Sequence, residues 1–128
     1  MIDSIYKVLE ELEIQSTLEK SKKVNIPSED RMLAITKETG ELINMILRLK
    51  NAKNMLEVGM SIGYSTIWCA EAISEQSGKI ITIEQNQNKI KRAKENFQKA
   101  GVTDTIIIKK GLAIQILTEL SLQKKYRD

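Results

Sequence analysis

The chain has 128 residues, 41% hydrophobic and 29% charged, so its length fits one domain with one modest core. No apolar run approaches the roughly 18 residues that a membrane-spanning helix needs, and a net charge of +3 from 20 basic and 17 acidic residues argues against a nucleic-acid partner. The sequence has no histidine and a single cysteine, which excludes an internal disulfide, so we expect a cytoplasmic protein without the commonest general base.

The N-terminal region has the pattern of helices. Apolar residues recur at three- and four-residue steps over 2–20, which predicts an amphipathic helix. The residues on its apolar face are Ile5, Leu9 and Leu12. Pro27 precedes an acidic run, and this pattern predicts a short helix that starts at Ser28. Thr36 is the expected N-cap of a further helix that ends near 51–53. Its predicted apolar stripe consists of Leu42, Ile43, Ile46, Leu47 and Leu49.

From about residue 54 the pattern changes to short, β-branched apolar runs that alternate with helical segments. Strand alternating with helix is typical of a parallel sheet, so the fold class is α/β. The predicted strands are 55–58, 79–83 and 105–108. The first helix between them is predicted over 64–76, and the last helix over 113–122. The helix before Gly101 has an apolar face made of Ile90, Ala93, Phe97 and Ala100.

The end of the first predicted strand carries the main candidate site. In open parallel sheets, ligands bind beyond the carboxyl ends of the strands, where the strand order reverses. Gly59 and Gly63 allow a sharp turn and let a ligand approach without a Cβ in the way. Glu84, 25 residues after Gly59, has the spacing of a carboxylate that accepts the hydroxyls of a ribose. The third wall, small enough for an adenine ring, is formed by Gly111, Leu112 and Ala113.

Three ligand chemistries compete for this pattern. The dinucleotide motif G-x-G-x-x-G fails, because Ser61 and Tyr64 occupy its second and third glycine positions. Residues 59–63 match the G-x-S-x-G nucleophile elbow of hydrolases, but no histidine is present to activate Ser61. The third interpretation is a methyl-donor site, in which Glu57 helps to hold the amino-acid end of the donor and Glu84 holds its ribose. A plain alternative also stays open, in which these residues only form a tight turn in an α/β core.

Two segments carry a resemblance to a known family. Residues 31–42 (RMLAITKETGEL) and 56–68 (LEVGMSIGYSTIW) are similar to the O-methyltransferase family related to catechol and caffeoyl-coenzyme A methyltransferases. The likeness covers most of the chain, and it implies a Rossmann-like class I methyltransferase fold that uses S-adenosylmethionine and a small-molecule hydroxyl acceptor. It also implies cofactor contacts by Glu57, Gly59, Met60, Ser61, Gly63, Tyr64, Ser65, Glu84, Gln85, Gly111, Leu112 and Ala113. Many relatives have Gly-Asp-Ala at 111–113, and leucine in place of the aspartate removes one potential hydrogen bond to adenine.

The resemblance further implies one incomplete domain over 1–128, with a helical region over 1–53 and a Rossmann-like half over 54–128 that holds an incomplete parallel sheet. Relatives continue into a fourth strand with a metal-binding aspartate, so a divalent metal would need ligands from further polypeptide, and we expect no metal site within this chain. Without that strand, 55–58 becomes an edge that invites pairing with another chain. We therefore expect a fragment or truncated product, or a homo-oligomer or complementing chain at that edge, inactive or partner-dependent alone. The alternative function is a non-catalytic nucleotide-binding or oligomerising module, and no catalytic residue is assigned.

Two other features are interpreted as structural. Cys69 lies in the middle of a predicted helix among apolar residues, which is typical of a small core side chain rather than of a nucleophile. The helix before Gly101 carries several lysines interleaved with an acidic residue, a pattern that indicates a solvated helix face rather than an RNA-binding surface.

Overall fold

The computed structural model describes residues 2–21 and 34–127. In the described residues, two of the three helices predicted for the N-terminal region precede a regular alternation of strands and helices. The elements are α1 (Ile2–Lys20), α2 (Lys37–Leu49), β1 (Asn54–Val58), α3 (Tyr64–Ile73), η2 (Ser74–Gln76), β2 (Lys79–Glu84), α4 (Gln87–Ala100), η3 (Thr103–Thr105), β3 (Ile106–Lys110) and α5 (Ala113–Arg127). The short helix that was expected to start at Ser28 lies outside the described residues.

The strands form a parallel sheet in the order β1-β2-β3, which confirms the α/β fold class. The register aligns Leu56 with Ile81 and Ile81 with Ile107, so the carboxyl ends of the strands lie at one edge of the sheet. Within the described part of the chain, β1 pairs with β2 alone and is an edge strand, as the resemblance implies for a chain without the fourth strand.

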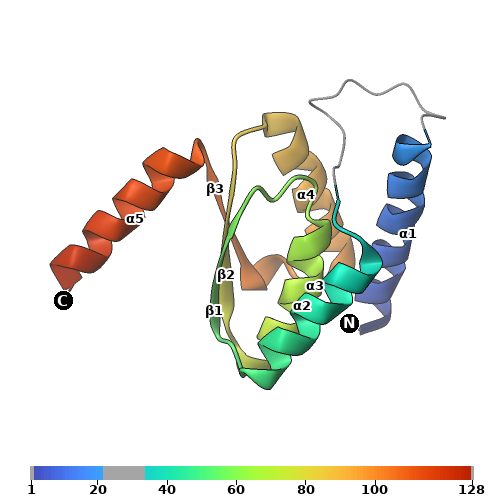
Figure 1. The fold of residues 1–128 in the computed structure, drawn as a ribbon, viewed down its shortest axis with the longest axis horizontal. Coiled ribbons are helices and arrows are strands. Elements are labelled where there is room, and N and C mark those ends of the chain that lie inside the picture. Colours follow the sequence, from blue (N-terminus) through green and yellow to red (C-terminus); the bar gives the residue numbers. More distant parts are fainter. Residues whose placement is uncertain (1, 22–33, 128) are drawn as a thin grey trace.

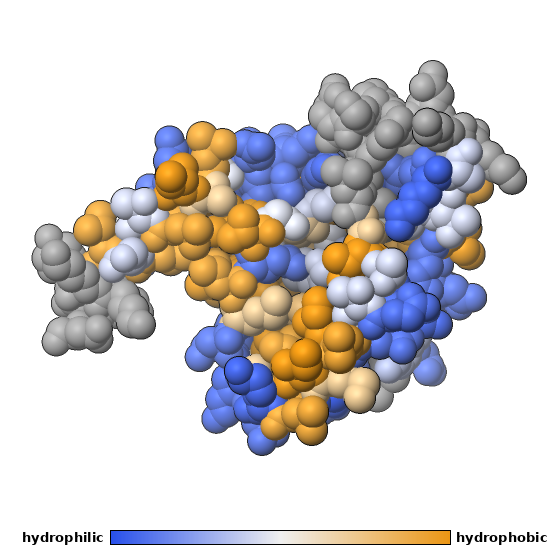
Figure 2. Space-filling view, viewed as in Figure 1, coloured by the Kyte–Doolittle hydropathy of each residue, from blue (hydrophilic) through white to orange (hydrophobic). Residues whose placement is uncertain are grey.

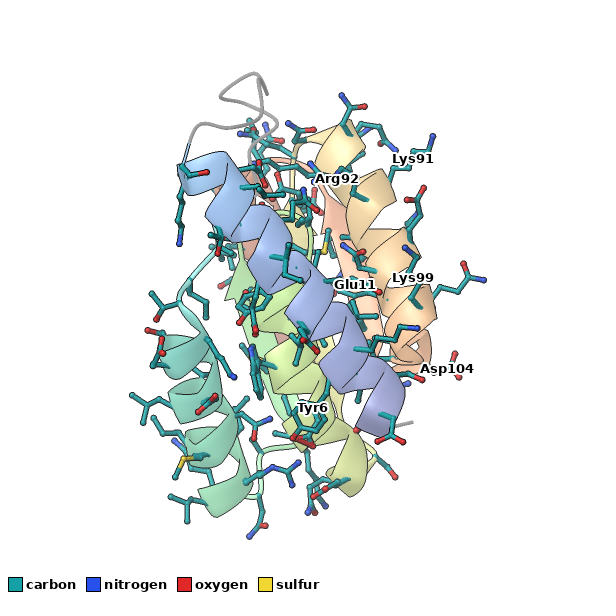
Figure 3. The ribbon with its side chains drawn as sticks, turned by 90° about the vertical axis from the view of Figure 1, so that its right-hand side faces the viewer. Tyr6, Glu11, Lys91, Arg92, Lys99 and Asp104 are labelled. Atoms are coloured by element: carbon teal, nitrogen blue, oxygen red, sulfur yellow. The ribbon has the colours of Figure 1, made fainter. Side chains whose placement is uncertain are left out.

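Helices α1 to α4 lie together on one side of the sheet (Figure 1). The predicted apolar face of α4 is buried, and Phe97 at its centre is only 2% exposed. Ile5, Leu9 and Leu12 of α1 are also buried, and Figure 3 shows α1 lying across the other helices with Tyr6 near its start. The ring of Tyr6 meets Trp68 of α3 edge to face, with 6.1 Å between centroids. The core therefore lies between the sheet and this helical layer.

The opposite face of the sheet is largely open among the described residues. Leu56, Val58 and Ile107 keep 46%, 55% and 41% of their surface exposed. Helix α5 is longer than predicted and leads away from the sheet (Figure 1), so that Ile114 is 76% exposed. Figure 2 shows apolar side chains gathered along α5 and over the adjoining sheet. Parallel sheets are ordinarily covered on both faces, so this face is an unsatisfied apolar surface.

Helix α2 begins as predicted but packs through a different face. The hydroxyl of Thr36 accepts the N–H of Thr39 at 3.2 Å, which makes Thr36 the N-cap. Only part of the predicted apolar stripe is covered, and its exposed members are Leu42, Ile46 and Leu49. Gly40 instead allows a close approach, because a Cβ there would lie 2.4 Å from the indole of Trp68. That approach turns a partly polar face of α2, with Gly40 and Asn44, toward α3. The predicted stripe was therefore wrong for its three exposed members.

The polar contact between α2 and α3 is a hydrogen-bonded network. The side-chain amide of Asn44 donates to the carbonyl oxygen of Trp68 at 2.7 Å and to Oε1 of Glu71 at 3.2 Å. Arg48 donates to Asn44 Oδ1 at 3.0 Å and pairs with the carboxylates of Glu71 and Glu75. Glu71 is only 6% exposed, so its charge is accommodated by these donors.

Candidate functional site

A cavity of about 170 Å³ lies at the carboxyl ends of all three strands. Backbone hydrogen bonds continue the parallel pairing at the base of this cavity. The N–H of Gly59 donates to the Ile83 carbonyl at 2.9 Å, and that of Gly111 donates to the Glu84 carbonyl at 3.0 Å. The lining residues are Val58, Gly59, Ile83, Glu84, Gln85, Gly111, Leu112 and Ala113. Three sequence segments predicted as separate walls of one site therefore meet, and the structure adds Val58 and Ile83 to them.

The loop between β1 and α3 uses left-handed backbone conformations. The φ angles are 83° at Gly59, 53° at Ser61 and 93° at Gly63. A Cβ on Gly59 would meet no described atom within 4 Å, so this glycine leaves open space beside the cavity. A Cβ on Gly63 would lie 2.4 Å from Cε1 of Phe97. The missing Cβ at Gly63 is therefore needed for packing against α4, and a ligand contact by Gly63 stays a prediction.

Glu84 holds this loop through its carboxylate. Its Oε1 accepts the N–H of Ser61 at 2.8 Å, and its Oε2 accepts the N–H groups of Gln85 at 3.1 Å and Asn86 at 3.0 Å. A carboxylate has about four acceptor positions, so these bonds leave one open on Oε1 among the described contacts. The carboxylate also compensates the left-handed strain at Ser61, a residue type that pays a steric penalty in that conformation.

Glu57 lies on the covered face of the sheet, beneath the first turn of α3. Its Oε2 accepts the hydroxyl of Ser65 at 2.7 Å, so the two residues expected at the amino-acid end of the cofactor contact each other. Its Oε1 accepts the hydroxyl of Thr82 at 2.7 Å and that of Thr66. Glu57 and Ser65 adjoin the cavity through the loop but do not line it.

Met60 and Tyr64 turn their side chains away from the cavity. Met60 is 1% exposed and belongs to the hydrophobic core, so only its backbone is available to a ligand in the cavity. The hydroxyl of Tyr64 donates to Oε2 of Glu13 in α1 at 2.7 Å. Burial raises the pKa of Tyr64 above its ordinary value, and the Glu13 carboxylate raises it further, so the phenol stays protonated.

The remaining reactive and charged groups have structural surroundings. Cys69 is buried in the core, as predicted, and this burial raises the pKa of its thiol to about 12, with a further contribution from the Glu57 carboxylate. Lys91 and Lys99 of α4 point outward into solvent (Figure 3). Residues 2–21 and 34–127 contain no cluster of Cys, Asp or Glu side chains placed to hold a metal ion. Over those same residues, no helix is both long and apolar enough to cross a membrane.

The two threonines that bind Glu57 were not predicted as part of the site. Thr82 is the polar residue in the interior of β2, between Ile81 and Ile83, and both Thr82 and Thr66 are 0% exposed. A hydroxyl in the middle of a buried strand needs a hydrogen-bond partner. That rule gives a sequence signal for a buried acceptor near Thr82, but it does not identify Glu57 as that acceptor.

Comparison with known proteins gives a consistent result. A family model described as O-methyltransferase matches residues 7–128. The chain is 36% identical over 88 residues to a catechol O-methyltransferase of Niastella koreensis, covering 69% of this chain and 39% of that protein. It is 36% identical over 89 residues to caffeoyl-CoA O-methyltransferase 1 of Eucalyptus globulus, covering 70% of this chain and 36% of the relative.

Among solved structures, the O-methyltransferase TomG of Streptomyces achromogenes, crystallised in complex with SAM, aligns with a TM-score of 0.70 and 29% identity. The alignment covers 91% of this chain and 46% of TomG. The chain thus spans less than half the length of each of these three proteins.

Proposed function

Because the chain belongs to the O-methyltransferase family, we propose that it forms the S-adenosylmethionine-binding half of an enzyme that methylates a hydroxyl group on a small molecule. The observation that carries this proposal is the cavity itself. Its lining includes an open glycine, Gly59, together with Glu84 and the small residues at 111–113. A nucleoside with a free ribose diol would suit that combination of a close backbone approach, a carboxylate acceptor and a small apolar wall.

Each part of the cofactor has residues that suit it. Glu84 would accept a ribose hydroxyl at its open position, and a second hydroxyl would replace one of the backbone donors that now bind Oε2. The wall at 111–113 would hold the adenine through apolar contact, with Leu112 in place of a polar partner. Glu57 and Ser65 would hold the amino-acid end, beside the N-terminus of α3. The cavity of about 170 Å³ is smaller than the roughly 300 to 1,000 Å³ of drug-sized sites, so it would form only part of the complete cofactor site.

The chemistry asked of these residues is binding and orientation. The bound cofactor would supply a methyl group on a sulfonium, which an acceptor oxygen attacks in line. The residues described above would hold and orient that donor, whereas the described part of the chain has no metal cluster and the sequence has no histidine to activate the acceptor. We therefore expect acceptor activation to need groups other than the described residues, and little or no methyl transfer by this chain alone.

We propose that the partner of this chain is a complementing polypeptide that adds a strand beside β1 and covers the open face. The edge position of β1 and the exposure of Leu56 and Val58 support this partner. The aligned relatives are more than twice as long as the segment they share with this chain, which favours the remainder of their fold over a second copy. Sedimentation tests both a complementing polypeptide and a second copy of the chain. A stable monomer that binds no added complement contradicts both. A cytoplasmic location belongs to the same proposal, supported by the buried, unpaired Cys69.

Titration calorimetry with S-adenosylhomocysteine tests the cofactor assignment. We expect the wild-type chain to bind, and Glu84→Gln to weaken binding by about tenfold, because a charge-assisted hydrogen bond is lost while the side-chain length is kept. Glu119→Gln, at an exposed position on α5, is the matched control and should bind like wild type. A folded wild-type chain that does not bind, or a Glu84→Gln chain that binds unchanged, contradicts the proposal and favours the non-catalytic module.

A further inference from the structure

Glu57 is bound by hydroxyl groups on both of its carboxylate oxygens. Ser65 donates to Oε2 at 2.7 Å from the first turn of α3. Thr82 of β2 donates to Oε1 at 2.7 Å, and Thr66 of α3 donates to the same oxygen. The two threonines thus approach Oε1 from the sheet and from the helix layer above it.

Packing alone does not explain threonine at these positions. Both side chains are 0% exposed, and valine has nearly the same shape without a buried hydroxyl. A buried hydroxyl is tolerated only with a partner, and for both threonines that partner is the same carboxylate oxygen. The shared partner indicates that the two hydroxyls serve Glu57.

The bonds divide the two oxygens of Glu57 unequally. Each carboxylate oxygen has about two acceptor positions. Among the described contacts, Thr66 and Thr82 take both positions on Oε1, whereas Ser65 takes one of the two on Oε2. The free acceptor position among the described contacts is therefore on Oε2, the oxygen that Ser65 binds.

We propose that Thr66 and Thr82 are positioning residues for cofactor binding. They commit Oε1 to the protein and hold the carboxylate so that Oε2 accepts the ammonium group at the amino-acid end of S-adenosylmethionine. This inference rests on the proposed function, since it assigns two further residues to the same site. It concerns only the amino-acid end of the ligand, and a nucleoside without that end does not depend on it.

Two ligands separate positioning from general damage. S-adenosylhomocysteine carries the amino-acid end, and 5′-methylthioadenosine has the same nucleoside and sulfur without it. Thr82→Val should weaken S-adenosylhomocysteine binding by about tenfold and leave methylthioadenosine within about twofold, as measured by calorimetry. Thr82→Ser, which keeps the hydroxyl, should restore the affinity. Thr103→Val, at an exposed position in η3, is the control.

Thr66→Val and Thr66→Ser form an independent second pair. They test the same role if thermal unfolding shows that a Thr82 variant is not folded. An equal loss for both ligands, or unchanged binding of S-adenosylhomocysteine by both valine variants, overturns the positioning role. A wild-type chain that binds methylthioadenosine but gains nothing from the amino-acid end overturns it too, while the nucleoside assignment survives. A wild-type chain that binds neither ligand overturns the proposed function and this inference together.

Discussion

Alanine at Gly63 and alanine at Gly59 should have different consequences, although both glycines have left-handed backbone conformations. The φ angles of 93° and 83° are similar, so an added Cβ brings a similar backbone penalty of about 1 to 2 kcal/mol at each position. At Gly63 the Cβ would also lie 2.4 Å and 2.7 Å from two ring atoms of Phe97. Phe97 is 2% exposed, and forcing extra volume into a packed core costs about 1 to 3 kcal/mol more.

The expected loss of unfolding free energy is therefore about 2 to 5 kcal/mol for Gly63→Ala and about 1 to 2 kcal/mol for Gly59→Ala. A domain of this size has a total stability of about 5 to 15 kcal/mol, so the difference is measurable by urea denaturation followed by circular dichroism. The order should reverse for ligand binding. Gly59→Ala places its methyl group beside the cavity, so it should weaken the binding of S-adenosylhomocysteine more than Gly63→Ala does.

A second substitution tests the cause of the larger loss. Phe97→Leu removes the ring that Gly63→Ala would contact, so the double variant should be more stable than the sum of the two single losses by at least about 1 kcal/mol. Equal destabilisation by the two alanine substitutions, or strictly additive losses in the double variant, would refute the assignment of Gly63 to packing.

Two further predictions concern the contact between α2 and α3. Arg48→Met removes the cation that pairs with the buried carboxylate of Glu71 and should lower the unfolding free energy by about 2 to 3 kcal/mol in urea titrations, whereas Lys37→Met should change it by less than about 0.5 kcal/mol. Similar effects of the two would contradict a buried network. The hydrogen bond and charge of Arg48 lower the pKa of Glu75, so this pair stabilises the fold above the unfolded pKa and loses that effect as pH falls through the folded pKa. Glu75→Gln should thus be less stable than wild type at pH 7, with a gap that closes below about pH 4; a gap that persists in acid excludes this origin.

The sheet and its main helices follow from local sequence patterns. All three predicted strands form within two residues of their expected bounds, and the buried face of α4 is the one that the apolar spacing indicates. These features depend on backbone propensity and on the burial of one regular face, and both can be read from a short window. The α2 stripe failed because Gly40 faces Trp68, a contact between residues far apart in the sequence.

The candidate site shows the same division. The spacing of glycines and carboxylates predicted that Gly59, Glu84 and residues 111–113 share one place, because parallel strands end at a common edge. The sequence did not show that Gly63 packs on Phe97, that Met60 is a core side chain, or that Tyr64 bonds to Glu13. A motif specifies which residues surround a turn, whereas the direction of each side chain depends on what packs against it.

The sequence by itself thus determined the α/β fold class, the strand ends that carry the site, and the similarity to O-methyltransferases. The tertiary structure alone decided how the two carboxylates are used. Glu84 is engaged by backbone N–H groups of the loops around it, and Glu57 by hydroxyls from β2 and α3. Hydrogen-bond donors reach a carboxylate only within about 3 Å, and that distance is set by the packing of strand on strand and helix on sheet rather than by spacing along the chain.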